Sequence, residues 1–246
     1  MSEGESGDLD GGDKQRAVYL AQAEIYDRLV SAEDTARNLD AALAAAFDWR
    51  GARVLDMGCG TGRMSRVLFG LGVRHVLGVD RAGPMLDVAR ERLAPLLAEG
   101  QSFELCEADA REVDVGREPF DAAVAGWVFG HFRHWMPDGW RADVGRALDR
   151  LEQAVRPGGV AIVVETLGTN HESPRAHAAL DEYFTFLEEE RGYTRTWVRT
   201  DYLFASAEEA CEVLGAFFPE ELIAAVRARG SAAVPECTGI WSRRRD

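Results

Sequence analysis

A turn built almost entirely from small residues constrains this chain more than any other feature. The stretch VLDMGCGTGRM, residues 54–64, leads from a short apolar segment into three glycines at alternate positions, Gly58, Gly60 and Gly62, with Asp56 two residues ahead of them. Glycine permits positive φ angles and lets the backbone approach a ligand with no Cβ atom in between. In an open α/β sheet, the turn after the first strand meets the ligand first. The pattern therefore predicts a turn that holds a nucleoside.

Short segments rich in apolar and β-branched residues alternate with helical segments along the first two thirds of the chain. The clearest helix carries Val144, Leu148 and Leu151 on one face, and another begins at Pro84. Strands that alternate with helices form parallel βαβ units. We therefore expect an α/β fold with an open, doubly wound sheet. The expected strands cover 53–57, 75–80, 102–109, 120–127 and 160–166.

The last third of the chain has a different pattern. We expect a helix over 173–192 and a strand over 194–204, in which polar and apolar residues alternate. Such alternation indicates a strand with one exposed face, which suits an antiparallel edge better than a central parallel position. Ser206 and Pro219 are expected to begin two further helices, and ECTGIWSRR is expected to close the chain as a strand.

Composition excludes several classes of protein. The chain of 246 residues carries a net charge of −14, which opposes binding to the phosphate backbone of a nucleic acid. No stretch reaches the roughly 18 consecutive apolar residues of a membrane-spanning helix. The four cysteines lie far apart and form no CxxC pair, so we expect reduced thiols. We therefore expect a cytoplasmic protein with a small-molecule partner and neither a nucleic-acid nor a membrane partner.

The glycine spacing discriminates between nucleoside ligands. The dinucleotide fingerprint requires G-x-G-x-x-G, but counting from Gly58 and Gly60 places Arg63 where the third glycine belongs. The chain also lacks the G-x-x-x-x-G-K-S/T pattern of a phosphate-binding loop. The pattern that matches is acid-x-G-x-G-x-G, with Asp56 as the acid and Gly62 as the last glycine.

VLDMGCGTG resembles the first motif of class I S-adenosylmethionine (SAM)-dependent methyltransferases, and four further segments match that family in order. They are LGVD, which ends at Asp80, EADA, which contains Asp109, FDAAVAGWVFGHF, and LEQAVRPGGVAIVVE, which ends at Glu165. The resemblance is strong over residues 20 to 166 and looser over the tail. It implies a mostly parallel seven-stranded sheet with helices on both faces, an antiparallel C-terminal edge strand and SAM as the cofactor.

The resemblance also divides the chain. Residues 1–13, rich in Gly, Ser and acidic residues, are expected to be disordered. Residues 14–50 are expected to form an N-terminal helical lid, since in the family such a leading helix often closes over the cofactor. Residues 51–246 would form the Rossmann-like SAM-binding domain, in which about 167–235 cover the methyl acceptor.

By resemblance, specific residues would hold the cofactor. Asp80, at a strand end, would accept hydrogen bonds from both ribose hydroxyls, although an aspartate before RAGPM is also able to cap a helix. Asp109 would accept from the adenine amino group and Ala110 would donate its amide to the ring, or Asp109 is a solvated loop acid. The other expected cofactor contacts are Tyr26, Asp56, Gly58, Gly60, Gly62, Arg81, Met85 and Trp127.

Methyl transfer requires the nucleophile and the methyl group to be held in line, with water excluded. His131 matches a histidine common in the family and is expected to act as the base, or else to brace its loop. Glu165, at the end of the fifth strand, is the second catalytic candidate, or a structural acid bonded to loop amides. Aromatic faces suit a sulfonium, which favours Trp127 and, on the leading helix, Tyr19 or Tyr26. We expect no metal, because the acids of the metal-dependent branch are not recognisable.

The sequence thus predicts an enzyme that moves a methyl group from SAM to an O or N atom of a small molecule. Two alternatives stay open. One is an NAD(P)-dependent oxidoreductase, which Arg63 and the lack of a Tyr-x-x-x-Lys pair disfavour. The other is a SAM-binding regulatory protein without transferase activity, which intact glycines and acids do not exclude. The sequence does not predict the oligomeric state.

Overall fold

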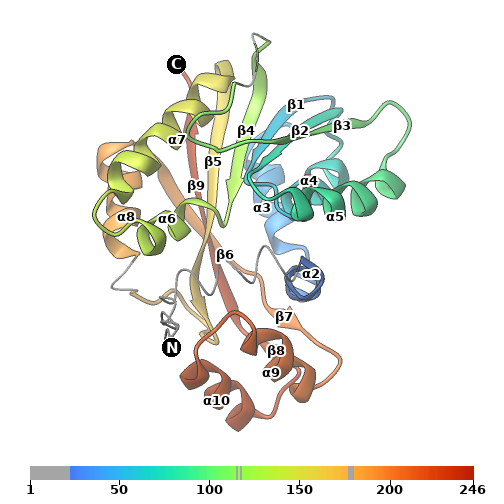
Figure 1. Ribbon diagram of the computed structural model, residues 1–246, viewed down its shortest axis with the longest axis vertical. Helices are drawn as coiled ribbons and strands as arrows, with labels where there is room; N and C mark the ends of the chain where they lie inside the picture. Colours follow the sequence, from blue (N-terminus) through green and yellow to red (C-terminus); the bar gives the residue numbers. More distant parts are fainter. Residues whose placement is uncertain (1–22, 115, 117, 177–179) are drawn as a thin grey trace, which may run out of the picture.

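A seven-stranded sheet forms the centre of the protein (Figure 1). The structure, a computed structural model, describes residues 23–246 except 115, 117 and 177–179. The expected disordered tail over 1–13 and the start of the expected lid therefore lie outside the described residues. In sheet order, the strands are β3 (Ser102–Glu107), β2 (His75–Asp80), β1 (Arg53–Met57), β4 (Phe120–Gly126), β5 (Val155–Thr169), β9 (Glu236–Arg244) and β6 (Thr194–Arg199).

The expected α/β fold, with a doubly wound and mostly parallel seven-stranded sheet, is confirmed. Strands β1 to β5 run parallel to one another, whereas β9 pairs antiparallel with both β5 and β6. The closing strand therefore lies between β5 and β6, and β6 is the outermost strand of the antiparallel edge. The carboxyl ends of β1, β2 and β4 lie together at one end of the strands, where ligands bind in such folds.

Side chains that alternate along the strands form two cores, one on each face of the sheet. Leu55 and Val163 belong to the core under one helical layer, and their chain neighbours Val54 and Ile162 belong to the core under the other. Figure 1 shows the two layers on opposite sides of the sheet. One layer consists of α6 (Phe129–Trp135), α7 (Trp140–Ala154) and α8 (Asp181–Thr185), and the other of α3 (Asn38–Ala46), α4 (Arg63–Gly70) and α5 (Gly83–Leu93).

A third core lies beyond the end of the sheet. There Leu29 packs with Tyr202, Val213, Ile223 and Val234. Leu29 comes from α2, so this core joins the described N-terminal helix to the C-terminal part of the chain, which Figure 1 shows below the sheet. The contributing elements are α2 (Ala23–Ala32), β7 (Tyr202–Leu203), α9 (Ala207–Gly215), α10 (Glu220–Arg229) and β8 (Ala233–Val234).

Two expected elements differ from those observed. The helix expected over 173–192 begins only at Asp181 and continues as a π-helical segment, Phe186–Glu190; before it, the backbone N–H of Arg175 donates to Leu167 of β5. The strand expected over 194–204 is interrupted at Thr200, where the chain leaves the main sheet and β7 pairs with β8 instead. Ser206 caps α9 as expected, because its hydroxyl accepts from the backbone N–H of Glu209.

Candidate functional site

A pocket opens at the carboxyl ends of β1, β2 and β4. Its walls come from α2, the glycine turn after β1, the segments that follow β2 and β3, and the first turns of α6. Most of the predicted site residues line it, although they come from distant parts of the sequence. They are Tyr26, Gly58, Gly60, Asp80, Arg81, Met85, Asp109, Ala110, Trp127 and His131.

The glycine turn forms the floor of the pocket. Gly58 and Gly60 have φ angles of +73° and +53°, a region that favours glycine. The backbone N–H groups of Gly58 and Cys59 both donate to the carbonyl of Val79, at 2.6 and 3.0 Å, which fixes the turn against β2. A Cβ atom at Gly58 would lie 2.2 Å from Val128 Cγ2, so a larger residue there would force Val128 to shift. The turn therefore exposes bare backbone to the pocket.

Asp80 ends β2 beside this turn. Its Oδ2 accepts from the backbone N–H of Gly60, and its Oδ1 from that of Ala82, both at 2.9 Å. Each carboxylate oxygen has room for a second hydrogen bond, so two hydroxyl groups of a ligand are able to donate to Asp80 as well. Burial raises the pKa of Asp80 above its usual value. Asp80 thus lines the pocket and bonds to Ala82, the N-cap residue of α5, but it does not itself cap that helix as the alternative had it.

Tyr26 places α2 over the glycine turn. The aromatic atom Cε1 of Tyr26 lies 3.7 Å from the point where a Cβ atom on Gly60 would be. Burial raises the pKa of Tyr26 to about 12, so its hydroxyl stays protonated at neutral pH. The ring of Phe217, which follows α9, meets the Tyr26 ring edge-on at 5.9 Å.

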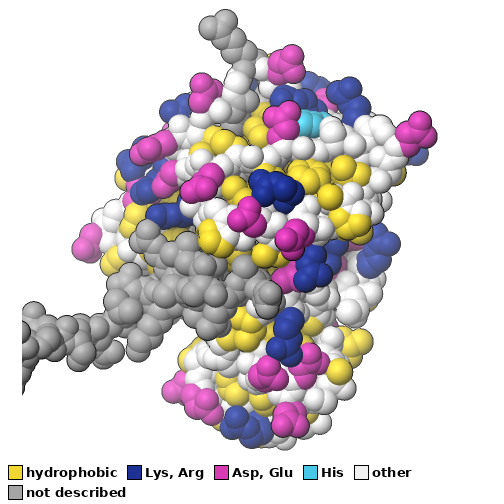
Figure 2. Space-filling model, turned by 45° about the vertical axis from the view of Figure 1, so that its right-hand side comes forward, with side chains coloured by type: hydrophobic (Ala, Val, Ile, Leu, Met, Phe, Trp, Pro, Cys, Tyr) yellow, Lys and Arg dark blue, Asp and Glu magenta, His cyan; other side chains and the backbone are white. Residues whose placement is uncertain are grey.

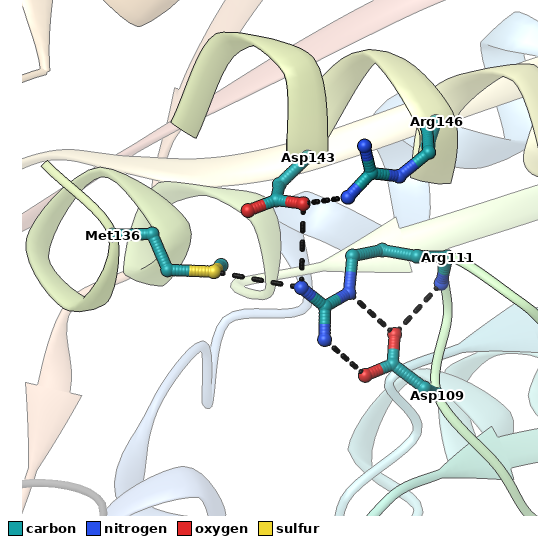
Figure 3. A network of polar contacts seen from close by, with 5 residues as sticks. All are labelled: Asp109, Arg111, Met136, Asp143 and Arg146. Carbon is teal, nitrogen blue, oxygen red and sulfur yellow. Dashed lines mark hydrogen bonds and ion pairs between the residues drawn. The ribbon is translucent and has the colours of Figure 1, made fainter. Parts of the chain in front are cut away.

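Asp109 lines the pocket as half of a tight ion pair, shown in Figure 3. Its Oδ1 accepts from the backbone N–H and the Nε of Arg111, at 2.9 and 2.8 Å, and its Oδ2 from Nη2 at 2.6 Å. These hydrogen bonds lower the pKa of Asp109 to about 2. Arg111 is held in turn by Asp143 of α7 at 3.3 Å. Asp109 is therefore paired rather than free, although 24% of its side chain is exposed, and its Oδ2 has capacity for one further donor.

Helix α6 forms the opposite wall. His131 and Trp135, one helical turn apart, stack with ring centroids 5.0 Å apart and an angle of 10° between the ring planes. Both line the pocket, and so does Phe132. Phe129, by contrast, is fully buried in the core beneath α6. The indole N–H of Trp135 is buried without a hydrogen-bond partner among the described residues, which leaves it as a donor beside the pocket.

Comparison with known proteins assigns the chain. The methyltransferase domain family matches residues 55–163, which span the glycine turn, Asp80, Asp109 and His131. The malonyl-(acyl-carrier protein) O-methyltransferase of Salmonella typhimurium is 32% identical over 166 residues, which are 67% of this chain and 59% of that protein. Residues 55–163 belong to the methyltransferase domain family, and the chain is a SAM-dependent methyltransferase.

Two solved structures share the fold of this methyltransferase. Magnesium protoporphyrin IX methyltransferase from Synechocystis, solved with bound SAM, superposes with a TM-score of 0.56 at 15% identity, over 98% of this chain and 99% of that one. The (4+2)-cyclase SpnF superposes with a TM-score of 0.58 at 17% identity, over 96% and 97%. These likenesses show the fold alone. The chain spans less than two thirds of the Salmonella relative, so the likeness does not identify the methyl acceptor or the partners of this chain.

The pocket fits SAM, which is the cofactor of this methyltransferase. The bare backbone at Gly60 would accept the methionyl end, and Asp80 would receive the ribose hydroxyls. The buried side chain of Met85 offers an apolar surface beside Asp109 and Ala110, where a flat base would lie. No cluster of three potential metal ligands occurs among the residues that the structure describes.

Three predicted site residues lie outside the pocket lining of the methyltransferase. Gly62, at φ +87°, packs the start of α4 against Leu93 of α5, which lies 3.0 Å from where a Cβ atom would be. Asp56 is fully buried, where Ser65 Oγ donates to its Oδ2 at 2.6 Å. Burial raises the pKa of Asp56 to about 7, and its Oδ1 has no partner among the described residues. Both residues therefore act on the shape of the turn from behind it.

Glu165 is the third. Its Oε1 accepts from the backbone N–H of Gly130 at 2.9 Å and from the Tyr183 hydroxyl at 3.1 Å, and the side chain is buried. Burial raises its pKa to about 7. Glu165 lies within β5, which continues to Thr169, and it does not line the pocket, because Gly130 of α6 and Tyr183 of α8 contact its carboxylate. The observed contacts match the alternative, a structural acid bonded to loop amides, and they hold the first turn of the helix that carries His131.

Sequence reasoning missed Arg63, Arg111 and Trp135. In the sequence, Arg63 only breaks the dinucleotide pattern, yet its guanidinium lies over the Trp127 ring, with Cζ 3.3 Å from the centroid. One face of Trp127 is thus already covered by a cation. Trp135 had a usable signal, since it follows His131 by one helical turn. No sequence signal pointed to Arg63, because its partners are distant in the chain. None pointed to Arg111, because it pairs with Asp109 within a loop.

Proposed function

We propose that the protein moves the methyl group of SAM to an oxygen or nitrogen atom of a small-molecule acceptor. The single observation that carries this proposal is that His131 lines the same pocket as the glycine turn and Asp80. A side chain able to take up a proton near neutral pH thus borders the space in which the methyl donor would lie.

SAM supplies a methyl group on a sulfonium that is itself a good leaving group. In our proposal, Asp80 binds the ribose, Asp109 and Ala110 bind the adenine, Met85 and Arg81 border these groups, and Gly58 and Gly60 hold the methionyl end. Tyr26 covers the turn and excludes water, while Trp127 borders the methyl group. The acceptor loses a proton as it takes up the methyl group, and Nδ1 or Nε2 of His131 accepts that proton. Asp56 and Gly62 maintain the turn, and Glu165 maintains α6.

The acceptor is proposed to be small because of the charge and shape of the protein. The net charge of −14 opposes nucleic acid, and acidic and basic side chains are interspersed over the face seen in Figure 2. The proposed lid, residues 14–50, and the proposed acceptor cover, about 167–235, share the third core through Leu29.

The four cysteines are free thiols, which suits the cytoplasm that we propose as the compartment of the protein.

The test is a search for labelled product. Purified protein is incubated with SAM carrying a tritiated methyl group and with three kinds of acceptor: a metabolite extract, an RNA pool and a protein extract. We expect label in the small-molecule fraction only, with S-adenosylhomocysteine (SAH) formed in equal amount. Label in RNA or protein alone would contradict the proposed acceptor. Tight SAM binding without product in any fraction would favour the alternative of a SAM-binding regulatory protein.

A further inference from the structure

Arg63 connects the wall of the pocket to helix α2. Its guanidinium packs on the Trp127 ring, with Cζ 3.3 Å from the ring centroid, and its Nη2 lies 2.7 Å from Glu33 Oε1. The two side chains of this ion pair are 10% and 2% exposed. Trp127 lines the pocket, whereas Glu33 directly follows α2. One buried cation therefore contacts two elements that are 94 residues apart in the chain (127 − 33).

Trp127 needs such a neighbour because of its backbone. Its φ angle is +54°, which is unusual for a bulky side chain, and its N–H donates to the carbonyl of Val164 at 2.7 Å. Residues in this region persist where their surroundings fix them, and they cluster at binding sites. The Arg63 guanidinium covers one face of the indole and so restricts the ring to its place in the pocket wall.

Glu33 is fixed on its other side by the antiparallel part of the sheet. The hydroxyl of Thr200 donates to Glu33 Oε1 at 3.0 Å, and it also bonds to the hydroxyl of Thr238 on β9. Both threonines are fully buried. The end of α2 is thus held between Arg63 and β9 at a mostly buried position, where an ion pair is screened less than at the surface.

Helix α2, which is joined to Arg63 through Glu33, also reaches the cofactor site. Helix α2 carries Tyr26 over the glycine turn, against the space above Gly60. If Arg63 releases Glu33, α2 loses its buried attachment to α4, and Trp127 loses the cation on its ring. Tyr26 then keeps its contact with Phe217, and Trp127 keeps its backbone hydrogen bond to Val164, but both lose the attachment that they share through Arg63.

We propose that Arg63 is a positioning residue for the cofactor, which holds Trp127 in the pocket wall and α2 over the glycine turn, and thereby slows cofactor release. This inference rests on the proposed function only in that SAM and its product occupy the pocket. It does not depend on which acceptor is methylated. Arg63 itself does not line the pocket, so it acts through Trp127 and through Glu33 with Tyr26.

The test measures the dissociation rate of SAH from the full chain. Removing one partner of a buried ion pair leaves an unpaired buried charge, whereas removing both charges is often neutral for stability. The informative variant is therefore the double substitution Arg63→Met with Glu33→Gln, because the glutamine amide oxygen still accepts from Thr200. We expect this variant to stay folded and to release SAH at least about tenfold faster, with little change in the association rate.

Two further variants make the result specific. Arg63→Lys keeps a positive charge near Glu33 but loses the flat guanidinium on Trp127, and we expect an intermediate increase in the dissociation rate. Arg28→Met is the matched control, because Arg28 also joins α2 to another helix, through ion pairs with Glu209 and Glu212 on α9, but its side chain is 45% exposed. We expect release from this control within about twofold of the unsubstituted protein.

The outcomes are distinguishable. Dissociation at the unsubstituted rate in the double variant overturns the proposal, and so does an equal acceleration in Arg28→Met. If the double variant does not fold, the rate in Arg63→Lys decides in the same way. A purely structural role would lower the fraction of protein that binds without changing the dissociation rate of the remainder. If the unsubstituted protein binds neither SAM nor SAH, the assignment of the pocket fails rather than the role of Arg63.

Discussion

Gly58 and Val128 meet so closely that a Cβ atom on Gly58 would lie 2.2 Å from Val128 Cγ2. Gly58 begins the glycine turn, and Val128 directly precedes α6, which carries His131. The missing side chain therefore brings two walls of the pocket together, one that would hold the cofactor and one that would take up the proton. Glycine is required here twice, for its φ angle of +73° and for this contact.

Gly58→Ala is expected to destabilise the protein by about 2 to 5 kcal/mol, the sum of left-handed backbone strain and overpacking. Gly51→Ala is the matched control, because Gly51 has a φ angle of +72° with nothing within 4 Å of its Cβ position. The control should lose only the backbone part, about 1 to 2 kcal/mol. Urea denaturation measures both. Equal losses in the two variants would show that the contact with Val128 is unimportant.

Asp80→Asn should weaken SAM binding, because an asparagine has one acceptor oxygen where the carboxylate now serves Gly60, Ala82 and, in our proposal, the ribose. We expect a loss of about 1.5 to 3 kcal/mol of binding free energy, measured by calorimetry. Asp87→Asn, an exposed aspartate of α5 paired with Arg90, serves as the control and should leave the affinity unchanged. Unchanged affinity in Asp80→Asn would remove Asp80 from the cofactor site.

His131→Gln should separate catalysis from binding. If His131 is the base, its loss should lower kcat by about 10²-fold or more, while the affinity for SAM stays within about threefold. Single-turnover chemistry with the acceptor found by labelling gives the first quantity, and calorimetry gives the second. Normal chemistry combined with weakened SAM binding would instead assign His131 to the support of the pocket wall through Trp135.

Glu165 should make stability depend on pH. Burial raises its pKa from 4.5 to about 7 in the folded protein, so between these pH values the folded state holds a proton that the unfolded state has lost. Stability from this group is therefore complete below pH 4.5 and is lost as pH rises toward 7. Each pH unit in this window removes at most about 1.4 kcal/mol.

In Glu165→Gln the side chain is neutral at every pH, and its amide oxygen is still able to accept from Gly130 and Tyr183. The stability of Glu165→Gln relative to the unsubstituted protein should therefore increase as pH is raised from 5 to 8, measured by urea denaturation at each pH. The exposed Glu221 of α10 provides the control substitution, Glu221→Gln, which should leave the pH dependence unchanged. A constant difference between Glu165→Gln and the unsubstituted protein would show that Glu165 does not hold a proton in this range.

Local patterns predicted the elements that carry the pocket. The first, second and last strands begin and end at the residues expected, 53–57, 75–80 and 236–244. The tail was predicted less well, since the helix over 173–192 begins late and the strand over 194–204 is divided. In both segments, contacts with distant residues override the local preference: Arg175 bonds to β5, and Thr200 bonds to Glu33.

The sequence by itself determined the parallel sheet, the glycine turn and the acids at the strand ends, because these follow from periodicity within a few residues and from the φ angles that only glycine adopts freely. Only the tertiary structure decided how the charged groups around the pocket pair with one another and which of them are buried. It buries Glu165 beneath α6 and places Arg63 between Trp127 and Glu33. Such contacts depend on how elements far apart in the chain pack together, and no local pattern records them.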